Sequence, residues 1–276
     1  MPKPIVTLNE VSYRYPHAPG GTPPALSNVS LDIARGEFVA LVGANGSGKS
    51  TLARLLNGLI RPAPGEALVD GKSTADPANL DRIRETVGMV FQNPDSQIVA
   101  TTVGDDIAFG LENMGIPPDE IERRIEETAR RFGVAELLGR EPHWLSGGQK
   151  QRTVLAGVVA LRPRVLVLDE PTSMLDSRSQ REFRELIDEL WRDGATIVYI
   201  THLMEEIVTA PRLVALQDGA IVYDGAPRGF FSQPELTAST GLTPPLAVRI
   251  SQALAARGHR LPPALSLTEL VEAVCA

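Results

Sequence analysis

The sequence predicts an α/β fold in which a mostly parallel sheet is covered by helices on both faces. Short runs that are apolar or nearly so recur at residues 38–42, 87–91, 165–168 and 195–200. Apolar runs of this length are typical of strands that are buried on both faces. Helix-like segments separate the runs, as at residues 179–191. Repeated strands joined by helices indicate a parallel sheet.

Three regions depart from this alternation. Residues 5–8 and 29–33 alternate between apolar and polar side chains, which predicts strands of a half-exposed antiparallel β subdomain. The stretch from about 93 to 160 is mainly helical, and we expect it to form an inserted α-helical subdomain. The main domain is therefore expected to span residues 1–235, and a small C-terminal helical appendage residues 236–276.

Two helix signals predict the C-terminal appendage. Leu246, Ile250 and Leu254 fall on one face of a helix, and Gly258 can end that helix. Residues 266–269 read Ser-Leu-Thr-Glu, a capping box that opens a final short helix.

Composition restricts the class of protein. None of the apolar runs in the 276-residue chain approaches the ~20 residues needed to span a bilayer. The first residues lack a signal-peptide pattern, and the single cysteine, Cys275, fits a reducing compartment, so we expect a cytoplasmic protein. A net charge of −7 argues against a general nucleic-acid binder. A phosphate ligand must therefore be held by a local site.

Residues 43–50 read Gly-Ala-Asn-Gly-Ser-Gly-Lys-Ser and match the pattern G-x-x-x-x-G-K-[ST]. This loop lies between a buried strand and a predicted helix over 50–59, so its backbone N–H groups and the helix N-terminus can bind phosphate. Lys49 is expected to reach the β- and γ-phosphates of ATP, and Ser50 to ligate Mg²⁺. The core is therefore predicted to be a P-loop (RecA-like) nucleoside triphosphatase. The residues expected at the phosphates are Gly43, Ala44, Asn45, Gly46, Ser47, Gly48, Lys49, Ser50 and Thr51.

The apolar run at 165–168 ends in two carboxylates, Asp169 and Glu170. Ligands bind outside the carboxyl ends of the strands in open parallel sheets. Asp169 is expected to hold Mg²⁺, and Glu170 to orient or deprotonate the attacking water.

Residues 145–149, Leu-Ser-Gly-Gly-Gln, form a second candidate phosphate site. Ser146 is placed to cap a helix, and Gly147 and Gly148 permit close approach of a ligand to the backbone. Gln149 completes the segment. One chain thus carries two anion-binding helix ends that are nearly a hundred residues apart in the sequence.

With these motifs, residues 4–232 resemble the ATP-binding-cassette (ABC) family. The resemblance implies that two subunits pack head to tail and clamp each ATP between the phosphate loop of one and residues 145–149 of the other. Four further residues resemble family motifs in the expected order. Tyr15 would stack on adenine, and Gln92 would touch Mg²⁺ and the attacking water. Asp176 lies in the loop that would cross to the other subunit, and His202 would contact the γ-phosphate. Tyr13 is a rival for the stacking role.

Residues 91–97, 102–103, 105–113 and 173–176 resemble the ATPases of energy-coupling-factor (ECF) importers, as does the C-terminal tail. The resemblance implies uptake of a vitamin or transition-metal ion through a transmembrane coupling protein and a substrate-binding membrane protein. It also implies a peripheral location on the inner face of the cell membrane, with the segment from Gln92 to Gly104 receiving the membrane partner.

Several alternatives stay open at this point. The chain can be the ATPase of a binding-protein-dependent importer, or a soluble ABC regulator, although it lacks the twin cassettes or long coiled-coil insertions usual in regulators. A non-hydrolysing scaffold would be expected to have lost Glu170 or His202. The active dimer can be a homodimer or a heterodimer with a paralogous ATPase.

Overall fold

The computed structural model describes residues 3–258 and 264–275. Its central sheet has the strand order β10-β9-β3-β8-β7-β6. The strands are β3 (Phe38–Val42), β6 (Val87–Val90), β7 (Val165–Asp169), β8 (Thr196–Ile200), β9 (Arg212–Gln217) and β10 (Ala220–Gly225). All neighbours pair in parallel except β9 and β10, which form an antiparallel hairpin at one edge. The predicted α/β fold with a mostly parallel sheet is confirmed.

A second sheet is antiparallel, with the order β2-β1-β4-β5. Its strands are β1 (Val6–Tyr13), β2 (Leu26–Ile33), β4 (Glu66–Val69) and β5 (Lys72–Ser73). Val6 pairs with Ile33 on one side and with Val69 on the other. Both segments that alternate in the sequence therefore lie in this sheet.

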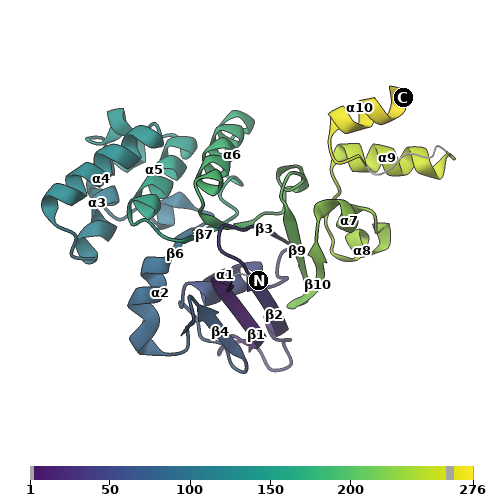
Figure 1. Ribbon diagram of the computed structural model, residues 1–276, viewed down its shortest axis with the longest axis horizontal. Helices are drawn as coiled ribbons and strands as arrows, with labels where there is room; N and C mark the ends of the chain where they lie inside the picture. The colour runs from purple at the N-terminus through teal and green to yellow at the C-terminus, as the bar shows by residue number, and fades with distance from the viewer. Residues whose placement is uncertain (1–2, 259–263, 276) are drawn as a thin grey trace.

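The helices are α1 (Lys49–Leu56), α2 (Leu80–Thr86), α3 (Val103–Asn113), α4 (Pro118–Arg131), α5 (Gly147–Ala160), α6 (Ser177–Arg192), α7 (Pro227–Phe231), α8 (Pro234–Ser239), α9 (Leu246–Ala256) and α10 (Leu267–Cys275). Figure 1 shows α3, α4 and α5 at one end of the long axis of the molecule and α9 and α10 at the other, with the antiparallel sheet between and below them. None of the described helices is long and apolar enough to cross a membrane.

The central sheet separates two hydrophobic cores, which explains why its inner strands are almost continuously apolar. In β3, Phe38, Ala40 and Val42 face the core shared with α3 to α6, whereas Val39 and Leu41 face the opposite core. The opposite core contains α1 and the antiparallel sheet. Side chains alternate between the two faces of a strand, so burial on both faces requires a continuous apolar run.

Several element ends differ from the sequence predictions. Helix α1 ends at Leu56 rather than at residue 59, because Gly58 adopts a left-handed φ of 70° that no helix interior allows. Helix α6 begins at Ser177 rather than at residue 179, because Asp176 caps it. Strand β6 ends at Val90, one residue earlier than predicted.

The C-terminal helices form where they were expected. On the predicted apolar face of α9, Ile250 and Leu254 are half-buried and pack against the cluster shared with α10, but the most deeply buried residues lie beside that face. Ala247, Val248 and Ser251 are buried, whereas Leu246 on the predicted apolar face is 51% exposed. Gly258 ends α9 with a φ of 93°. In α10, the Glu269 N–H donates to Ser266 Oγ as in a capping box, but the Glu269 carboxylate accepts from Leu265 N rather than from Ser266 N.

Candidate active site

The phosphate loop joins the carboxyl end of β3 to the first turn of α1, and its shape requires glycine. Gly43 and Gly48 have φ values of 152° and 107°, in a region that favours glycine. A Cβ atom at Gly43 would lie 2.3 Å from the carbonyl oxygen of Leu216, and one at Gly48 would lie 2.5 Å from that of Ala25. Any side chain at either position would therefore displace the backbone behind the loop.

Two features of the loop fit a bound phosphate. Ser47 Oγ is buried and has no hydrogen-bond partner in the part of the chain that the structure describes. Lys49 is 5% exposed, and its Nζ donates to the carbonyl oxygens of Gly43 over 2.8 Å and Ala44 over 3.0 Å. Burial lowers the pKa of Lys49, while the negative charges of Glu170 and Asp169 oppose that shift. A buried ammonium group of this kind gains from a polyphosphate anion.

Two of the three residues expected at Mg²⁺, Ser50 and Asp169, lie side by side. Ser50 Oγ donates to Asp169 Oδ1 over 3.2 Å, although the two residues are 119 positions apart. Burial raises the pKa of Asp169, the hydrogen bond from Ser50 lowers it, and the nearby charge of Glu170 raises it further. A cation beside Asp169 would offset the free-energy cost of burying its negative charge. A site with few protein oxygen ligands suits Mg²⁺, because this ion keeps several bound waters and is also ligated by phosphate groups of the substrate.

No group of three or more His, Cys, Asp or Glu side chains is arranged to hold a metal among residues 3–258 and 264–275.

Glu170 lies at the carboxyl end of β7 and contacts two other predicted catalytic residues through one oxygen atom. Gln92 Nε2 donates to Glu170 Oε2 over 3.1 Å, and His202 Nδ1 lies 3.1 Å from the same oxygen. The Glu170 side chain is 12% exposed, whereas that of His202 is 46% exposed. Three residues from separate loops thus meet where parallel strands end, as expected for a site at this edge of a sheet.

The pocket that these residues share has a volume of about 520 Å³, within the usual range for ligand sites. Its lining is Tyr15, Ala25, Asn45, Gly46, Gly48, Lys49, Ser50, Thr51, Gln92, Glu170 and His202. Ala25 was not predicted from the sequence, because a small apolar residue before β2 carries no motif. Gly43, Ala44 and Asp169 lie outside this lining but accept hydrogen bonds from Lys49 or Ser50 within it, and Ser47 also lies outside it.

Tyr15 rather than Tyr13 lines the pocket. Tyr15 O–H lies 3.2 Å from Thr51 Oγ1, which fixes the ring beside the first turn of α1. Tyr13 packs against Tyr15 at a ring-centroid distance of 5.0 Å and an interplanar angle of 86°. The Tyr13 ring therefore packs against the Tyr15 ring, and the geometry favours Tyr15 as the residue that stacks on adenine.

The second predicted phosphate site is a capped helix end. Ser146 Oγ accepts from Gln149 N over 3.3 Å, and Gln149 Oε1 accepts from Ser146 N over 2.9 Å, which completes a capping box at the start of α5. Neither residue lines the Tyr15–His202 pocket of the same chain. The structure therefore keeps this site and the phosphate loop apart within one chain.

Asp176 lies beside this second site. Its carboxylate caps α6 by accepting from Arg178 N and Ser179 N over 3.0 and 3.1 Å. A Cβ atom at Gly148 would lie 2.8 Å from Ser179 Oγ, so the start of α5 packs directly on the start of α6. A Cβ atom at Gly147 would lie 3.6 Å from the carbonyl oxygen of Met174.

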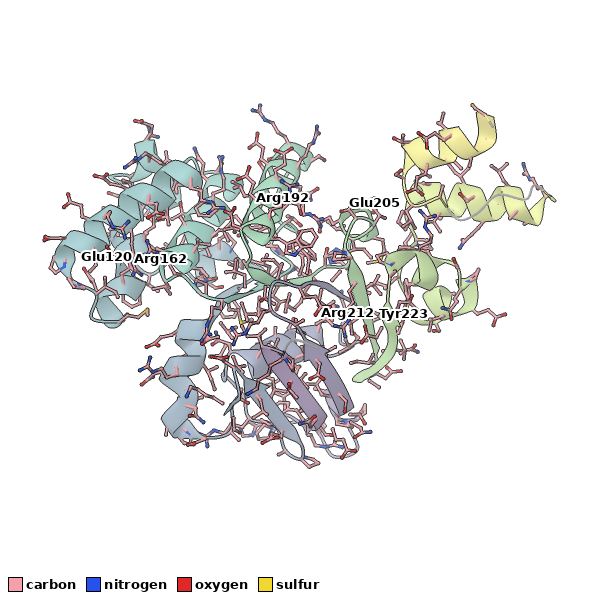
Figure 2. All side chains as sticks on the ribbon, in the orientation of Figure 1. Glu120, Arg162, Arg192, Glu205, Arg212 and Tyr223 are labelled. Carbon is pink, nitrogen blue, oxygen red and sulfur yellow. The ribbon has the colours of Figure 1, made fainter. Side chains whose placement is uncertain are left out.

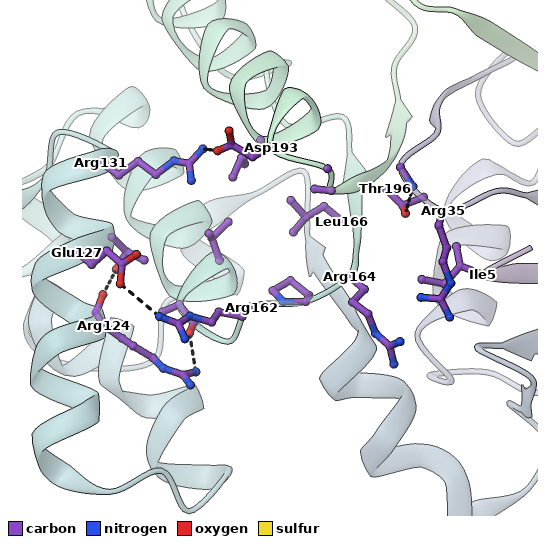
Figure 3. A pocket seen from close by; sticks show the side chains of 18 residues that line it. Ile5, Arg35, Arg124, Glu127, Arg131, Arg162, Arg164, Leu166, Asp193 and Thr196 are labelled. Carbon is purple, nitrogen blue, oxygen red and sulfur yellow. Dashed lines mark hydrogen bonds and ion pairs between the residues drawn. The ribbon is translucent and has the colours of Figure 1, made fainter. Parts of the chain in front are cut away.

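A separate cavity of about 460 Å³ lies at the amino ends of β7 and β8, the opposite end of these strands from Glu170. Five arginines line it: Arg35, Arg124, Arg131, Arg162 and Arg164. Figure 3 shows two of their ion pairs, in which Arg131 Nη2 lies 2.5 Å from Asp193 and Arg162 lies 3.4 Å from Glu127. The other three are paired with carboxylates outside the cavity lining, Arg124 with Glu120 and both Arg35 and Arg164 with Asp70. Arg162 also lies near Glu120 on α4, as Figure 2 shows. Because these arginines already pair with carboxylates of the same chain, we do not place the nucleotide in this cavity.

Together, the phosphate loop, the carboxylates at the end of β7 and the second helix end define an ATP-binding cassette. The family described as ABC transporter matches residues 26–173. The chain belongs to this family, and its relatives place it among the ATPases of energy-coupling-factor transporters.

Two relatives are similar along nearly their whole length. The energy-coupling factor transporter ATP-binding protein EcfA1 of Symbiobacterium thermophilum is 49% identical and covers 100% of this chain and 98% of its own length. The protein of the same name from Caldanaerobacter subterraneus subsp. tengcongensis is 42% identical, with coverages of 98% and 99%.

Two solved structures are similar in fold. One is cbiO1 from Clostridium perfringens, described as part of the ABC transporter complex cbiONQ, with a TM-score of 0.76, 33% identity and coverage of 93% of this chain and 98% of that one. The other is the dimeric ATP-binding cassette MJ0796 in a post-hydrolysis state bound to ADP and Pi. Its TM-score is 0.73 at 31% identity, and the similarity covers 82% of this chain and 100% of that one.

Proposed function

We propose that this ATPase hydrolyses MgATP between two copies of the cassette and so drives uptake of a vitamin or transition-metal ion through an ECF-type membrane partner. The observation that carries the proposal is the meeting of Gln92, Glu170 and His202 at one carboxylate oxygen beside the phosphate loop. A carboxylate placed there can take a proton from a water that attacks the γ-phosphate.

Each residue then has a distinct task. Lys49 turns from its own loop carbonyls to the β- and γ-phosphates, and Ser50, Asp169 and Gln92 hold Mg²⁺. Bound Mg²⁺ neutralises charge that develops on the phosphates during transfer. Glu170 orients and deprotonates the attacking water, and His202 contacts the γ-phosphate.

The second helix end supplies the reason for a dimer. Residues Ser146 to Gln149 form the capped N-terminus of α5 but do not line the pocket of their own chain. We propose that they bind the γ-phosphate held by a second copy or by a paralogous ATPase, with Asp176 at the same contact. Hydrolysis removes the γ-phosphate that links the two chains, so the dimer opens.

The membrane partner is proposed to dock beside Gln92. A cavity of about 440 Å³ lies there, lined by Asp95, Ile98, Ala100, Thr101, Glu141, Pro142 and His143. Val99 next to it is 63% exposed, so an apolar side chain is available to a partner. Lys150 Nζ of α5 lies 2.6 Å from Asp95, which links this docking segment to the helix that begins at the second phosphate site.

We also propose that α9 and α10 contribute to pairing of the two ATPases. Three large apolar side chains of α10 are 57–60% exposed: Leu267, Val271 and Val274. Leu246 of α9 adds a fourth exposed apolar side chain in the same appendage. A second chain can bury such a patch.

Purification of the complex from its native membrane tests the transport assignment. A tagged chain should pellet with membranes and bring down a transmembrane coupling protein and small substrate-binding membrane proteins. Recovery of a permease pair with an extracellular binding protein would support the alternative importer class instead. A chain that stays in the supernatant with no membrane protein would contradict a role in transport.

A further inference from the structure

The carboxylate of Glu206 accepts hydrogen bonds from three hydroxyl groups. Thr172 Oγ1 donates to Oε1 over 2.6 Å. Thr201 Oγ1 and Tyr199 O–H donate to Oε2 over 2.8 and 3.1 Å. Hydroxyl bonds to a charged acceptor are shorter and stronger than neutral ones. Glu206 belongs to none of the motifs of the nucleotide site and does not line the pocket.

Two of these hydroxyl donors lie within two positions of the proposed catalytic residues. Thr172 follows Glu170 by two positions, and Thr201 immediately precedes His202. Glu206 therefore connects the loop that carries the proposed general base with the loop that carries the γ-phosphate contact. Thr172 and Thr201 are 1% and 2% exposed, so water cannot easily replace the carboxylate as their partner.

The backbone conformation of Glu170 requires stabilisation by the residues around it. Its φ of 49° is a left-handed value, which is unfavourable for a residue with a side chain. Glu170 N donates to Ile200 O over 2.9 Å, and Ser173 N donates to Glu170 O over 3.2 Å. Backbones in this region persist where the surroundings hold them, and they concentrate at functional sites.

The third hydroxyl donor, Tyr199, belongs to the hydrophobic core. Burial raises the pKa of Tyr199, and the negative charge of Glu206 raises it further, so the phenol keeps its proton and donates it. The guanidinium of Arg184, on α6, lies 5.0 Å from the Tyr199 ring and also donates to the backbone carbonyl of Glu206. The carboxylate is thus fixed relative to the central sheet.

We propose that Glu206 is a positioning residue, which sets the 3.1 Å separation of Glu170 and His202 by holding Thr172 and Thr201 on one carboxylate. The proposal rests on the proposed catalytic roles of Glu170 and His202. Glu206 touches neither nucleotide nor water in this scheme, so its loss should slow the chemical step and leave ATP binding intact.

The test compares Glu206→Gln with Glu205→Gln in the full-length protein. Glu205 lies on the same short turn but is exposed, and Figure 2 shows its place above β9. Glu206→Gln keeps the size of the side chain but replaces one acceptor oxygen with a donor. We expect kcat for ATP hydrolysis to fall about 10-fold to 100-fold, because small misplacements of catalytic groups cost this much. KM for ATP should change less than about twofold, and Glu205→Gln should match the wild type.

A double-mutant cycle with Thr172→Val separates positioning from general damage. If Glu206 acts through Thr172, the double variant should lose little more kcat than Glu206→Gln alone. Additive losses, or a KM that rises as much as kcat falls, would overturn the proposal, as would an unchanged kcat in Glu206→Gln. Glu170→Gln is measured in parallel. If that variant keeps its turnover, the catalytic assignment itself fails, whereas an inactive Glu170→Gln beside a fully active Glu206→Gln overturns only the positioning role.

Discussion

Glu170 and His202 face each other across the ends of two neighbouring parallel strands, with Glu170 Oε2 3.1 Å from His202 Nδ1. They are brought together by the in-register pairing of β7 with β8, in which Asp169 lies opposite Ile200. The proposed proton acceptor and the proposed γ-phosphate contact therefore lie at one edge of the sheet. A backbone hydrogen bond from Glu170 N to Ile200 O joins the two strand ends.

Replacing His202 tests whether this pairing serves hydrolysis. His202→Ala should lower kcat by roughly 10²-fold to 10³-fold, the usual cost of losing one donor that stabilises developing charge. KM for ATP should change little, because the phosphate loop is intact. For the isolated ATPase, His143→Ala is a suitable control, since His143 is exposed and lines the proposed partner-docking cavity rather than the nucleotide pocket. Equal turnover in the His202 variant and the control would remove His202 from the site.

Tyr15 is expected to carry the adenine contact. Tyr15→Ala should raise KM for ATP roughly tenfold, since a base–aromatic stack contributes ~1–3 kcal/mol. Tyr15→Phe should stay near the wild type, because the ring remains even though the contact with Thr51 is lost. Tyr13→Ala should have a smaller effect. A larger effect at Tyr13 than at Tyr15 would assign the stacking role to Tyr13.

Two substitutions at Ser146 separate its structural and functional roles. Ser146→Ala removes the cap of α5 and should lower stability by ~0.5–2 kcal/mol as well as abolish ATP turnover. Ser146→Asp should restore the cap, because aspartate is a good N-cap residue, but its charge repels the γ-phosphate. We therefore expect thermal stability near that of the wild type with no ATPase activity. An active Ser146→Asp protein would show that this helix end does not meet phosphate.

Asp70 links the antiparallel sheet to the central sheet and should make stability depend on pH. It accepts from Arg164 Nη2 over 2.6 Å and from Arg35. Burial opposes ionisation of Asp70, but the hydrogen bonds and charges of Arg164 and Arg35 hold its pKa below the usual value of 3.8. Because the folded pKa is depressed, the contribution is fully present above the usual pKa and is lost as pH falls through the folded value.

Asp70→Asn should therefore lower the free energy of unfolding at pH 7 by at most about 1 kcal/mol. Urea denaturation of the two proteins between pH 7 and pH 3 measures this. The curves of stability against pH should converge as the acid limit is approached. A constant difference between them at every pH would show that the ion pairs are not the cause.

Much of the fold and the site follows from the sequence because both depend on local patterns. The buried strands appear as continuous apolar runs, and the phosphate loop requires glycine at Gly43 and Gly48 for steric reasons that act within the loop itself. The carboxylates Asp169 and Glu170 follow directly from their place at the end of such a run.

Other features depend on packing between distant segments, which a single sequence does not display. Ala25 lines the pocket only because β2 begins beside Gly48. The buried face of α9 is set by its neighbours, so Ala247 and Val248 are buried while Leu246 is exposed. The Glu206 network joins hydroxyl groups from two loops and a strand, and no spacing in the sequence marks it.

The central claim is that two chains hold one ATP between the phosphate loop of one and Ser146 of the other. The most direct measurement is the mass of Glu170→Gln in solution with saturating MgATP, together with the ATP that stays bound after rapid gel filtration. We predict a two-chain species that retains one ATP per chain, and loss of that retention when Ser146→Asp is added. A single-chain mass under these conditions would contradict the account.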